Sequence, residues 1–506
     1  MSSSSSWVVD VDYAEPQAHV EVERWVVDME KKVEDAEPRA KVERWPKHCI
    51  FRVPSRFKSK MVDGMASSVF KPQTVSLGPF HHDDKDLKPM EEHKLRAVRH
   101  LLRRDHAGGG GCGKLTLRGL VAAVEKVGDE LEDSYMDLGD EWRGKEKRGK
   151  FLEMMITDGC FLLEVMRTTI AIGGKGYVPK DYEHGDPVFS WHGIQHIGPF
   201  VQRDMLLVEN QLPLRLLDKI IAVEEGTSPS AGSINSMVLK FLGREDVPEG
   251  TGLGLHPLDI YRTSRLIKGT RIIKMKNNGK VLHRDRGVEV DQEEMSAAAA
   301  TDQVRPQKVK VVPRSAWKLS EAGIRFVPNK TGCLDDIHLK NGRLHNGTLY
   351  MPKVHMDDST AYRIHNMMAF EAMHVGTGND VTAYVLFLKD LINSADDVRL
   401  LERKGILEHD LAADDDAVVR LFNSLTRDVS KNWKSHLCQV RDDMEQHYRS
   451  NHLRVFLYEA WSNLKSKYFR SPWTFLALVT AILLVVGDIV QAMYAVMSYD
   501  PKPKMH

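Results

Sequence analysis

Apolar side chains recur along most of the chain at the three- and four-residue spacing of an amphipathic helix. This pattern predicts a helix that begins near residue 89. It predicts further helices at about 115–138, 149–171 and 200–222, with a kink or a break at Pro213. Later helices are expected at about 360–374, 380–394, 396–404, 416–428 and 431–468. The chain is therefore expected to be mainly α-helical, with one large helical body.

One stretch has the alternating pattern of a strand pair. Residues 337–354 read IHLKNGRLHNGTLYMPKV, in which apolar and polar positions alternate. The dipeptides that begin at Asn341 and Asn346 are both Asn-Gly, the sequence that tight hairpin turns favour. We expect a small β-hairpin element in this stretch.

The most apolar run lies near the C-terminus, from Trp473 to Met497. About 20 apolar residues are needed to cross a bilayer as a helix, and this run is long enough. Its Leu, Ile, Val and Phe residues favour insertion by roughly 4–7 kcal/mol, against about 2.5–3.5 kcal/mol for the buried charge of Asp488. The run is interpreted as a single transmembrane helix at 472–498; a hydrophobic helix packed on the globular part is the alternative.

The flanking charges bear on the orientation of that helix. Basic residues before the run (Arg454, Lys465, Lys467 and Arg470) outnumber those after it (Lys502 and Lys504). The positive-inside rule therefore favours a cytosolic body, although the difference is small and the opposite orientation stays open. The N-terminus lacks both the basic region and the apolar region of a secretory signal peptide, so no such signal is expected. We expect a single-pass protein of the plasma membrane.

The chain divides by composition. Residues 1–47 are a polar leader that contains a near-duplication, with Val22-Glu-Arg-Trp25 repeated at Val42 to Trp45, and we expect part of it to be disordered. Residues 48–468 are expected to form the helical domain, with an irregular insertion at about 226–307. A short tail, 499–506, follows the apolar run.

Charge and cysteine content exclude several classes of protein. The 506 residues carry 71 basic and 71 acidic side chains, and this balance argues against a nucleic-acid-binding surface. Five cysteines without CxxC spacing do not describe a disulfide framework or a zinc site. We therefore expect no cofactor and no nucleic-acid partner.

Candidate motifs for catalysis and metal binding are weak. Residues 108–114 match GxxxxGK, but Leu115 stands where a phosphate-binding loop needs Ser or Thr. His192 and His196 are four apart, and no third ligand has a convincing spacing. No catalytic, cofactor-binding or metal-binding residue is assigned.

Buried polar residues are the stronger signal. Carboxylates and amides stand inside apolar helical stretches, at Asp158, Glu164, Asp204, Glu209 and Asn210. An unpaired buried acid is costly, so these groups should be hydrogen-bonded or paired. We interpret them as a structural polar network that joins two helices, with a catalytic acid pair as the alternative.

Two polar residues also interrupt the C-terminal apolar run. Asp488 and Gln491 are three apart and therefore share one face of a helix. A polar patch inside lipid is usually turned toward another helix or water. We expect this face to support self-association or contact with a membrane partner.

Eight segments, in this order, resemble the plant domain-of-unknown-function 247 family. They are CIFRVPSRF, VSLGPFHH, LKPMEEHK, DGCFLLE, DMLLVENQLP, SAWKLSEAGIRF, LYMPKVHMDDSTAYRIHNMMAFE and YFRSPWTFLALVTAILLV, and they span about residues 49–496. The resemblance implies a plant protein with a helical body, one C-terminal membrane helix and no established enzymatic activity. It also implies that recognition is a candidate role, because some grass members are proposed determinants of self-incompatibility. The leader, the Gly-rich loop and residues 280–306 depart from the pattern.

The sequence thus predicts a membrane-anchored, non-enzymatic recognition or signalling protein with an unidentified protein partner. One alternative is a hydrolase or transferase that uses the carboxylates between Asp158 and Glu209. Another is a purely structural membrane tether. Carboxylates that converge in an open pocket would favour the enzyme, and carboxylates sealed in a core would favour the scaffold.

Overall fold

The structure is a computed structural model, and it divides the chain into two compact units. Unit 1 comprises Met1–Ser59, Gly64–Tyr261 and Ala369–Gly378; unit 2 comprises Lys60–Asp63, Arg262–Met368 and Asn379–His506. The residues that the structure describes are 26–33, 47–58, 69–104, 115–175, 182–244, 252–266, 313–342, 347–410, 414–427, 435–451 and 472–497, with the single residues 429, 456 and 460.

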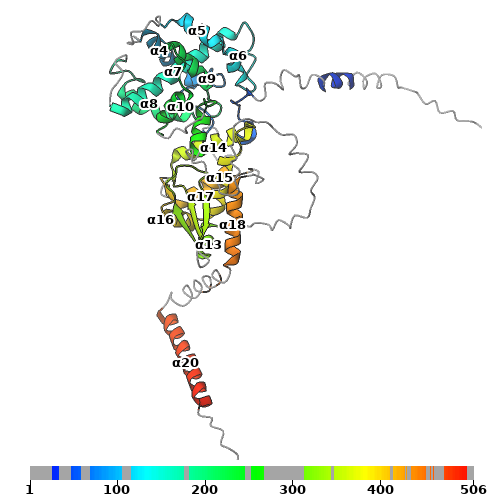
Figure 1. Cartoon of the computed structure of the whole chain (residues 1–506), viewed down its shortest axis with the longest axis vertical. Coiled ribbons are helices and arrows are strands. Elements are labelled where there is room, and N and C mark those ends of the chain that lie inside the picture. Colours follow the sequence, from blue (N-terminus) through cyan, green and yellow to red (C-terminus); the bar gives the residue numbers. More distant parts are fainter. Residues whose placement is uncertain are drawn as a thin grey trace, which may run out of the picture. The chain divides into compact units, whose positions relative to one another are not determined.

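Unit 1 is helical in its described part (Figure 1). Its helices are α3 (Ser55–Lys58), α4 (Pro89–Arg103), α5 (Leu117–Glu125), α6 (Gly128–Asp133), α7 (Arg148–Lys175), α8 (Trp191–Asp204), α9 (Leu214–Glu225) and α10 (Ala231–Phe241), with the short 3-10 helix η2 (Lys85–Leu87). Helix α11 (Pro257–Leu266) begins in unit 1 and ends in unit 2.

Helix α7 forms the core of unit 1. It packs against α4, α5, α8, α9 and α10. Its side chains are buried on several sides, and Phe151, Met155 and Phe161 have no exposed surface. A helix that is apolar all round needs a protein environment on every side, which explains its central position.

Local sequence signals account for most helix ends in unit 1. Pro89 stands at the first position of α4, where its missing N–H is not needed. The hydroxyl oxygens of Thr116 and Ser190 accept backbone N–H bonds at the starts of α5 and α8, and Gly226 ends α9 in the left-handed conformation. The stretch expected as one helix at 200–222 is divided, with Pro213 at the start of α9 as anticipated.

Unit 2 contains two small sheets. In the first, the order is β1 (Ile324–Pro328), β3 (Gly347–Met351) and β2 (His338–Asn341). The antiparallel β2–β3 pair is the expected hairpin element, with His338 opposite Tyr350. The parallel pairing of β1 with β3 was not predicted. The second sheet pairs β4 (Val354–Met356) with β5 (Leu407–His409) in parallel.

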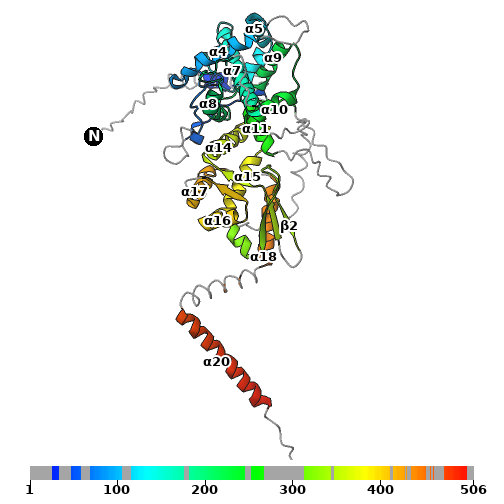
Figure 2. The ribbon, with the colours of Figure 1, turned by 90° about the vertical axis from the view of Figure 1, so that its left-hand side faces the viewer.

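Six helices accompany the sheets in the described part of unit 2. They are α13 (Ala316–Glu321), α14 (Asp358–Met373, whose last residues belong to unit 1), α15 (Asp380–Leu391), α16 (Ala395–Arg403), α17 (Asp415–Leu425) and α18 (His436–Ser450). Of these, α13 packs against β1, α16 against β5 and α18 against β2. Helix α18 lies beside β2 (Figure 2). Helix α15, which packs against α17 and α18, is almost wholly buried, so it forms the core of unit 2 as α7 does in unit 1.

Residues 472–497 form helix α20 (Pro472–Met497), where the apolar run predicts a helix. Among the residues that the structure describes, however, no helix combines the length and the apolar character needed to cross a bilayer. The transmembrane assignment is therefore not supported by the structure.

Several sequence-based expectations concern residues outside the described ranges. Residues 26–33 of the leader form an exposed helix, and the remainder of 1–46 lies outside. The GxxxxGK stretch at 108–114, residues 280–306 and the tail at 499–506 also lie outside. Helices α10 and α11 occupy the described part of the stretch at 226–307.

Candidate functional site

An extended segment, residues 69–80, is the feature around which the predicted polar residues gather. Pro72 and Pro79 interrupt it, and the structure places it in turns and bends rather than in a helix or strand. Its backbone N–H groups therefore need partners from elsewhere in unit 1. We call residues 69–80 the anchored segment, because buried side chains supply those partners.

Asp204, at the end of α8, holds the first part of the anchored segment. Its carboxylate accepts the backbone N–H groups of Gln73, Thr74 and Val75 at 2.7–3.1 Å. The side chain of Arg203 lies 2.9 Å from the same carboxylate. Burial raises the pKa of Asp204, while the backbone N–H bonds act in the opposite direction.

Asp158, in the middle of α7, holds the end of the anchored segment. It accepts the N–H of Gly78 at 2.8 Å and lies 2.7 Å from the ammonium of Lys94. That ammonium, on α4, also contacts Glu91 at 2.6 Å and the hydroxyl of Ser76 at 3.0 Å. Burial raises the pKa of Asp158, and the charge of Lys94 opposes that rise. One carboxylate thus links α4, α7 and the anchored segment.

Asn210 and Glu209 complete the attachment. Asn210 accepts the N–H of Leu77 at 2.7 Å and donates to the carbonyl of Val75 at 3.0 Å. Glu209 accepts the N–H of Val53 at 2.6 Å and lies 2.8 Å from the ammonium of Lys58. Burial alone would raise the pKa of Glu209, but the bonds from His81, Lys58 and Val53 outweigh it, and the pKa is lowered.

Glu164 belongs to a different group. Both of its oxygens face the guanidinium of Arg104, at 3.0 and 2.6 Å, and the hydroxyl of Tyr182 donates to it at 2.8 Å. The structure therefore brings Asp158, Asp204 and Asn210 to the anchored segment and Glu209 to Val53 and Lys58. Glu164, on α7, instead pairs with Arg104 at the end of α4. Most of these hydrogen bonds join a main-chain N–H group to a carboxylate, whereas the sequence predicted a network that joins two helices.

An open hollow of about 350 Å³ adjoins the anchored segment. Its lining includes Arg52, Phe80, Asp83, Asp84, Glu141 and Trp142. The guanidinium of Arg52 lies 4.4 Å from the ring centre of Phe80, and Asp84 pairs with Lys71 at 3.1 Å. Asp83 and Glu141 are exposed. We call this feature the acidic hollow, because three carboxylates and one guanidinium face it.

The acidic hollow was not predicted from sequence. Its residues come from three separate stretches, near 52, 79–84 and 141–142, and no local pattern links them. Two histidines, His81 and His82, stand beside Asp83 and Asp84 in this stretch. In the structure His81 lies 3.4 Å from Glu209, and the ring of His82 meets the edge of Trp142 at 5.2 Å.

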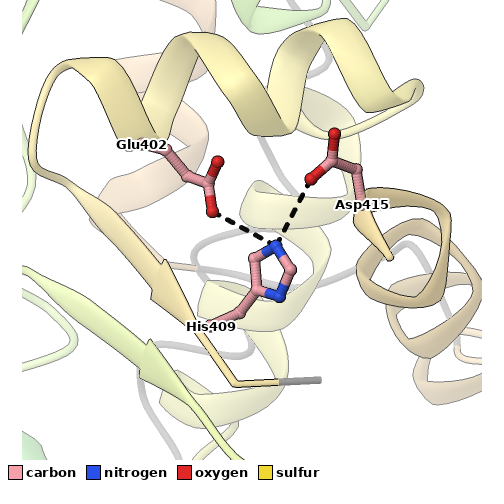
Figure 3. A group of neighbouring side chains, drawn as sticks. All are labelled: Glu402, His409 and Asp415. Carbon is pink, nitrogen blue, oxygen red and sulfur yellow. Dashed lines mark ion pairs between the residues drawn. The ribbon is translucent and has the colours of Figure 1, made fainter. Parts of the chain in front are cut away.

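A histidine and two carboxylates meet in unit 2 (Figure 3). Nε2 of His409, on β5, lies 3.2 Å from Glu402 on α16 and 3.4 Å from Asp415 on α17. The spacings of seven and six residues match no metal motif, so sequence reasoning missed the group. The three residues lie on a helix, a strand and a helix that follow one another closely in the chain, but only tertiary packing brings their side chains together.

The remaining sequence candidates lie apart from these features. His192 and His196 are both on the exposed side of α8, with ring centres 4.3 Å apart, because that helix continues through Pro199. Asp488 and Gln491 lie on α20, and both are exposed. Neither pair has a third ligand or an ionic partner among the contacts found for the described residues.

Comparison with known proteins gives a family and no activity. The DUF247 family model, described as a plant protein of unknown function, matches residues 50–487. The chain is similar to the UPF0481 protein At3g47200 of Arabidopsis thaliana, with 25% identity over 460 residues that cover 89% of this chain and 87% of the relative. It is also similar to the putative UPF0481 protein At3g02645 of Arabidopsis thaliana, with 20% identity and coverage of 92% and 93%. No solved structure matches the chain.

Proposed function

This chain belongs to the plant DUF247 family, whose description assigns no function, and we propose that it is a non-enzymatic recognition protein held at a membrane. Recognition takes place at the acidic hollow, which binds a basic segment of a protein partner. The observation that carries this proposal is the fixed position of the hollow beside an extended segment anchored by buried carboxylates. A rigid support reduces the conformational entropy that the binding surface loses when a partner binds.

The use of the buried carboxylates supports recognition over catalysis. A general acid or base must reach a proton of the substrate, directly or through one water. Asp158 and Asp204 have no exposed surface, and their oxygens accept main-chain N–H groups or pair with Lys94 and Arg203. A hydrolase or transferase built on these residues would have to break the bonds that fix the anchored segment.

The charge of the hollow supports a basic partner. Asp83, Asp84 and Glu141 line it together with Arg52 and His81. Asp84 already pairs with Lys71, so the negative charge that faces solvent comes from the exposed carboxylates of Asp83 and Glu141. Opposite charges across an interface steer association and select the partner. A lysine- or arginine-containing segment of another polypeptide fits this chemistry better than an anionic ligand.

Site-specific crosslinking tests the recognition part. A photoreactive amino acid replaces Glu141 in the full chain expressed in plant cells, and the same replacement at the nearby exposed Glu146, outside the lining, is the matched control. We expect an adduct with a second polypeptide from position 141 only, and its loss in an Asp83→Lys background. Equal adducts from both positions, or none from position 141, would refute the proposal.

The membrane part rests on α20. The described side chains from Ala481 to Ala495 are all exposed, and Leu483, Val485, Ile489 and Val490 are among them. An exposed apolar surface of this kind needs an apolar environment. The surroundings we propose are the acyl chains of a bilayer, with the polar face of Asp488 and Gln491 turned toward a second copy or another membrane helix.

Flotation tests the membrane part separately. The full chain and a chain that ends at Ser471 are mixed with liposomes and centrifuged through a density gradient. We expect only the full chain to float, and resistance of that fraction to alkaline carbonate would indicate insertion rather than surface attachment. A full chain that stays at the bottom of the gradient would refute the proposed membrane attachment. The proposed recognition at the acidic hollow would then be tested by crosslinking alone. A tether without recognition would float and give no adduct.

A further inference from the structure

The Glu402, His409 and Asp415 group in unit 2 has the composition of a metal site. One imidazole nitrogen and two carboxylate oxygens, each from a different element, lie within 4.8 Å of one another (Figure 3). We propose that these three residues bind one divalent transition-metal ion, zinc in preference to others. This inference is independent of the proposed function, which concerns the acidic hollow and α20.

The two distances from Nε2 are long for direct hydrogen bonds and close to the separation of two ligands on one ion. Zinc lies about 2.0–2.2 Å from nitrogen and oxygen ligands in tetrahedral geometry, so two ligand atoms on one ion are roughly 3.3–3.6 Å apart. Nε2 of His409 lies 3.2 Å from Oε1 of Glu402 and 3.4 Å from Oδ1 of Asp415. A typical N–H···O hydrogen bond is about 2.9–3.0 Å long.

The burial of His409 is a second, independent observation. Its side chain is 5% exposed. Nδ1 is buried and has no hydrogen-bond partner among the described residues. Nδ1 therefore bears the proton of a neutral ring, and Nε2, which faces both carboxylates, is the nitrogen with a free lone pair for a metal ion. An ion held by Nε2 and the two carboxylates would fix the ring, which has no hydrogen-bond partner at its buried end among the described residues.

The neighbouring backbone and side chains position the two carboxylates and the imidazole. Glu402 stands in the last turn of α16, and Gly405, with φ of 67°, reverses the chain so that β5 brings His409 back toward it. Asp415 begins α17, and its second oxygen, Oδ2, lies 2.7 Å from Nε of Arg399. Arg399 therefore acts as a positioning residue that leaves Oδ1 free to face His409.

The ligand types decide the kind of ion. An imidazole with two carboxylates suits zinc and related first-row ions, whereas calcium and magnesium prefer oxygen ligands alone. Glu402 and Asp415 are 35% and 23% exposed, so solvent reaches the group and can supply the fourth ligand. The ion would join α16, β5 and α17 and so stiffen this part of unit 2.

Calorimetric titration with zinc tests the site. The purified full chain is first stripped of metal with a chelator, and all samples carry His196→Ala, because His192 and His196 on α8 could bind zinc by themselves. We expect one zinc ion per chain. Glu402→Gln and His409→Gln should each weaken binding at least tenfold, while His338→Gln, a histidine beside a single carboxylate, should leave it unchanged.

A second readout separates coordination from loss of folding. Cobalt added in place of zinc should give the intense visible absorption of a tetrahedral ion, and this absorption should be absent in both ligand variants. Chelator-treated Glu402→Gln should melt within a few degrees of the chelator-treated parent, because the substitution preserves shape. Binding that is equal in the ligand variants, or no binding to the parent chain, would overturn the proposal and leave the group as a histidine paired with two carboxylates.

Discussion

The ammonium of Lys94 lies 2.7 Å from the carboxylate of Asp158, and neither side chain has more than 1% of its surface exposed. This pair joins α4 to α7, and the same carboxylate holds Gly78 of the anchored segment. Because both charges are buried, each depends on the other for its stability in the core.

Replacing Lys94 by Met should destabilise unit 1 strongly. Asp158 would remain buried without its cation, and such a loss costs about 3–5 kcal/mol. The double variant Lys94→Met with Asp158→Asn should recover part of that loss, because Asn still accepts the Gly78 N–H and carries no charge. Urea unfolding of Lys94→Met, Asp158→Asn, the double variant and the parent measures this coupling. Additive effects of the two substitutions would contradict it.

Asp204→Ala should release the first part of the anchored segment. The substitution leaves the N–H groups of Gln73, Thr74 and Val75 without their shared acceptor, at a cost of roughly 2–4 kcal/mol. Hydrogen–deuterium exchange should be faster at these three amides. The exposed Asp83→Ala is the control and should leave their exchange unchanged; an unaltered rate in Asp204→Ala would show that other groups hold the segment.

Gly78→Ala should disrupt the same segment sterically. Gly78 has φ of 80°, and an added Cβ would lie 2.8 Å from the hydroxyl of Tyr135 and 2.9 Å from the backbone oxygen of Gln211. The left-handed conformation alone costs about 1–2 kcal/mol for a residue with a side chain. Gly149→Ala is a matched control, because nothing lies within 4 Å of its added Cβ and it is in α7. Thermal denaturation should show a loss for the first and a gain of roughly 0.5–1 kcal/mol for the second.

His256 should make stability depend on pH. Nε2 of its ring lies 3.1 Å from the carbonyl oxygen of Cys49, and Nδ1 accepts the N–H of Asp259 at 3.3 Å, so the neutral ring is satisfied. Burial, the largest cause, lowers the pKa of His256 from 6.5 to about 4. The folded state therefore binds fewer protons than the unfolded state between these values, and stability is present above pH 6.5 and lost as the pH falls toward 4.

The size of this effect follows from the shift. Each pKa unit corresponds to about 1.4 kcal/mol, so His256 accounts for up to about 3 kcal/mol over the interval. His256→Gln retains a donor and an acceptor but does not titrate. Its unfolding free energy, measured from pH 7 to pH 4, should fall less steeply than that of the parent chain. Parallel curves for the two proteins would show that another group causes the dependence.

The sequence by itself determined where most helices form, because spacing, prolines and capping residues act over a few positions. Pro89 and Pro213 mark helix starts in both the sequence and the structure, whereas the start of α8 after Ser190 was not predicted. The Asn-Gly dipeptides likewise indicated the β2–β3 pair. The sequence also marked Asp158, Asp204 and Glu209 as unusual, since a carboxylate within an apolar run must find a partner.

Only the tertiary structure decided which partners those carboxylates have. Asp204 bonds residues about 130 positions earlier in the chain, and no local pattern records such a separation. The acidic hollow and the Glu402, His409 and Asp415 group are of the same kind, because residues from three stretches or elements meet in each. Helix propensity and capping act over a few neighbouring residues, whereas the pairing of a buried charge depends on how distant segments pack. For that reason the candidate sites could be located only in the folded chain.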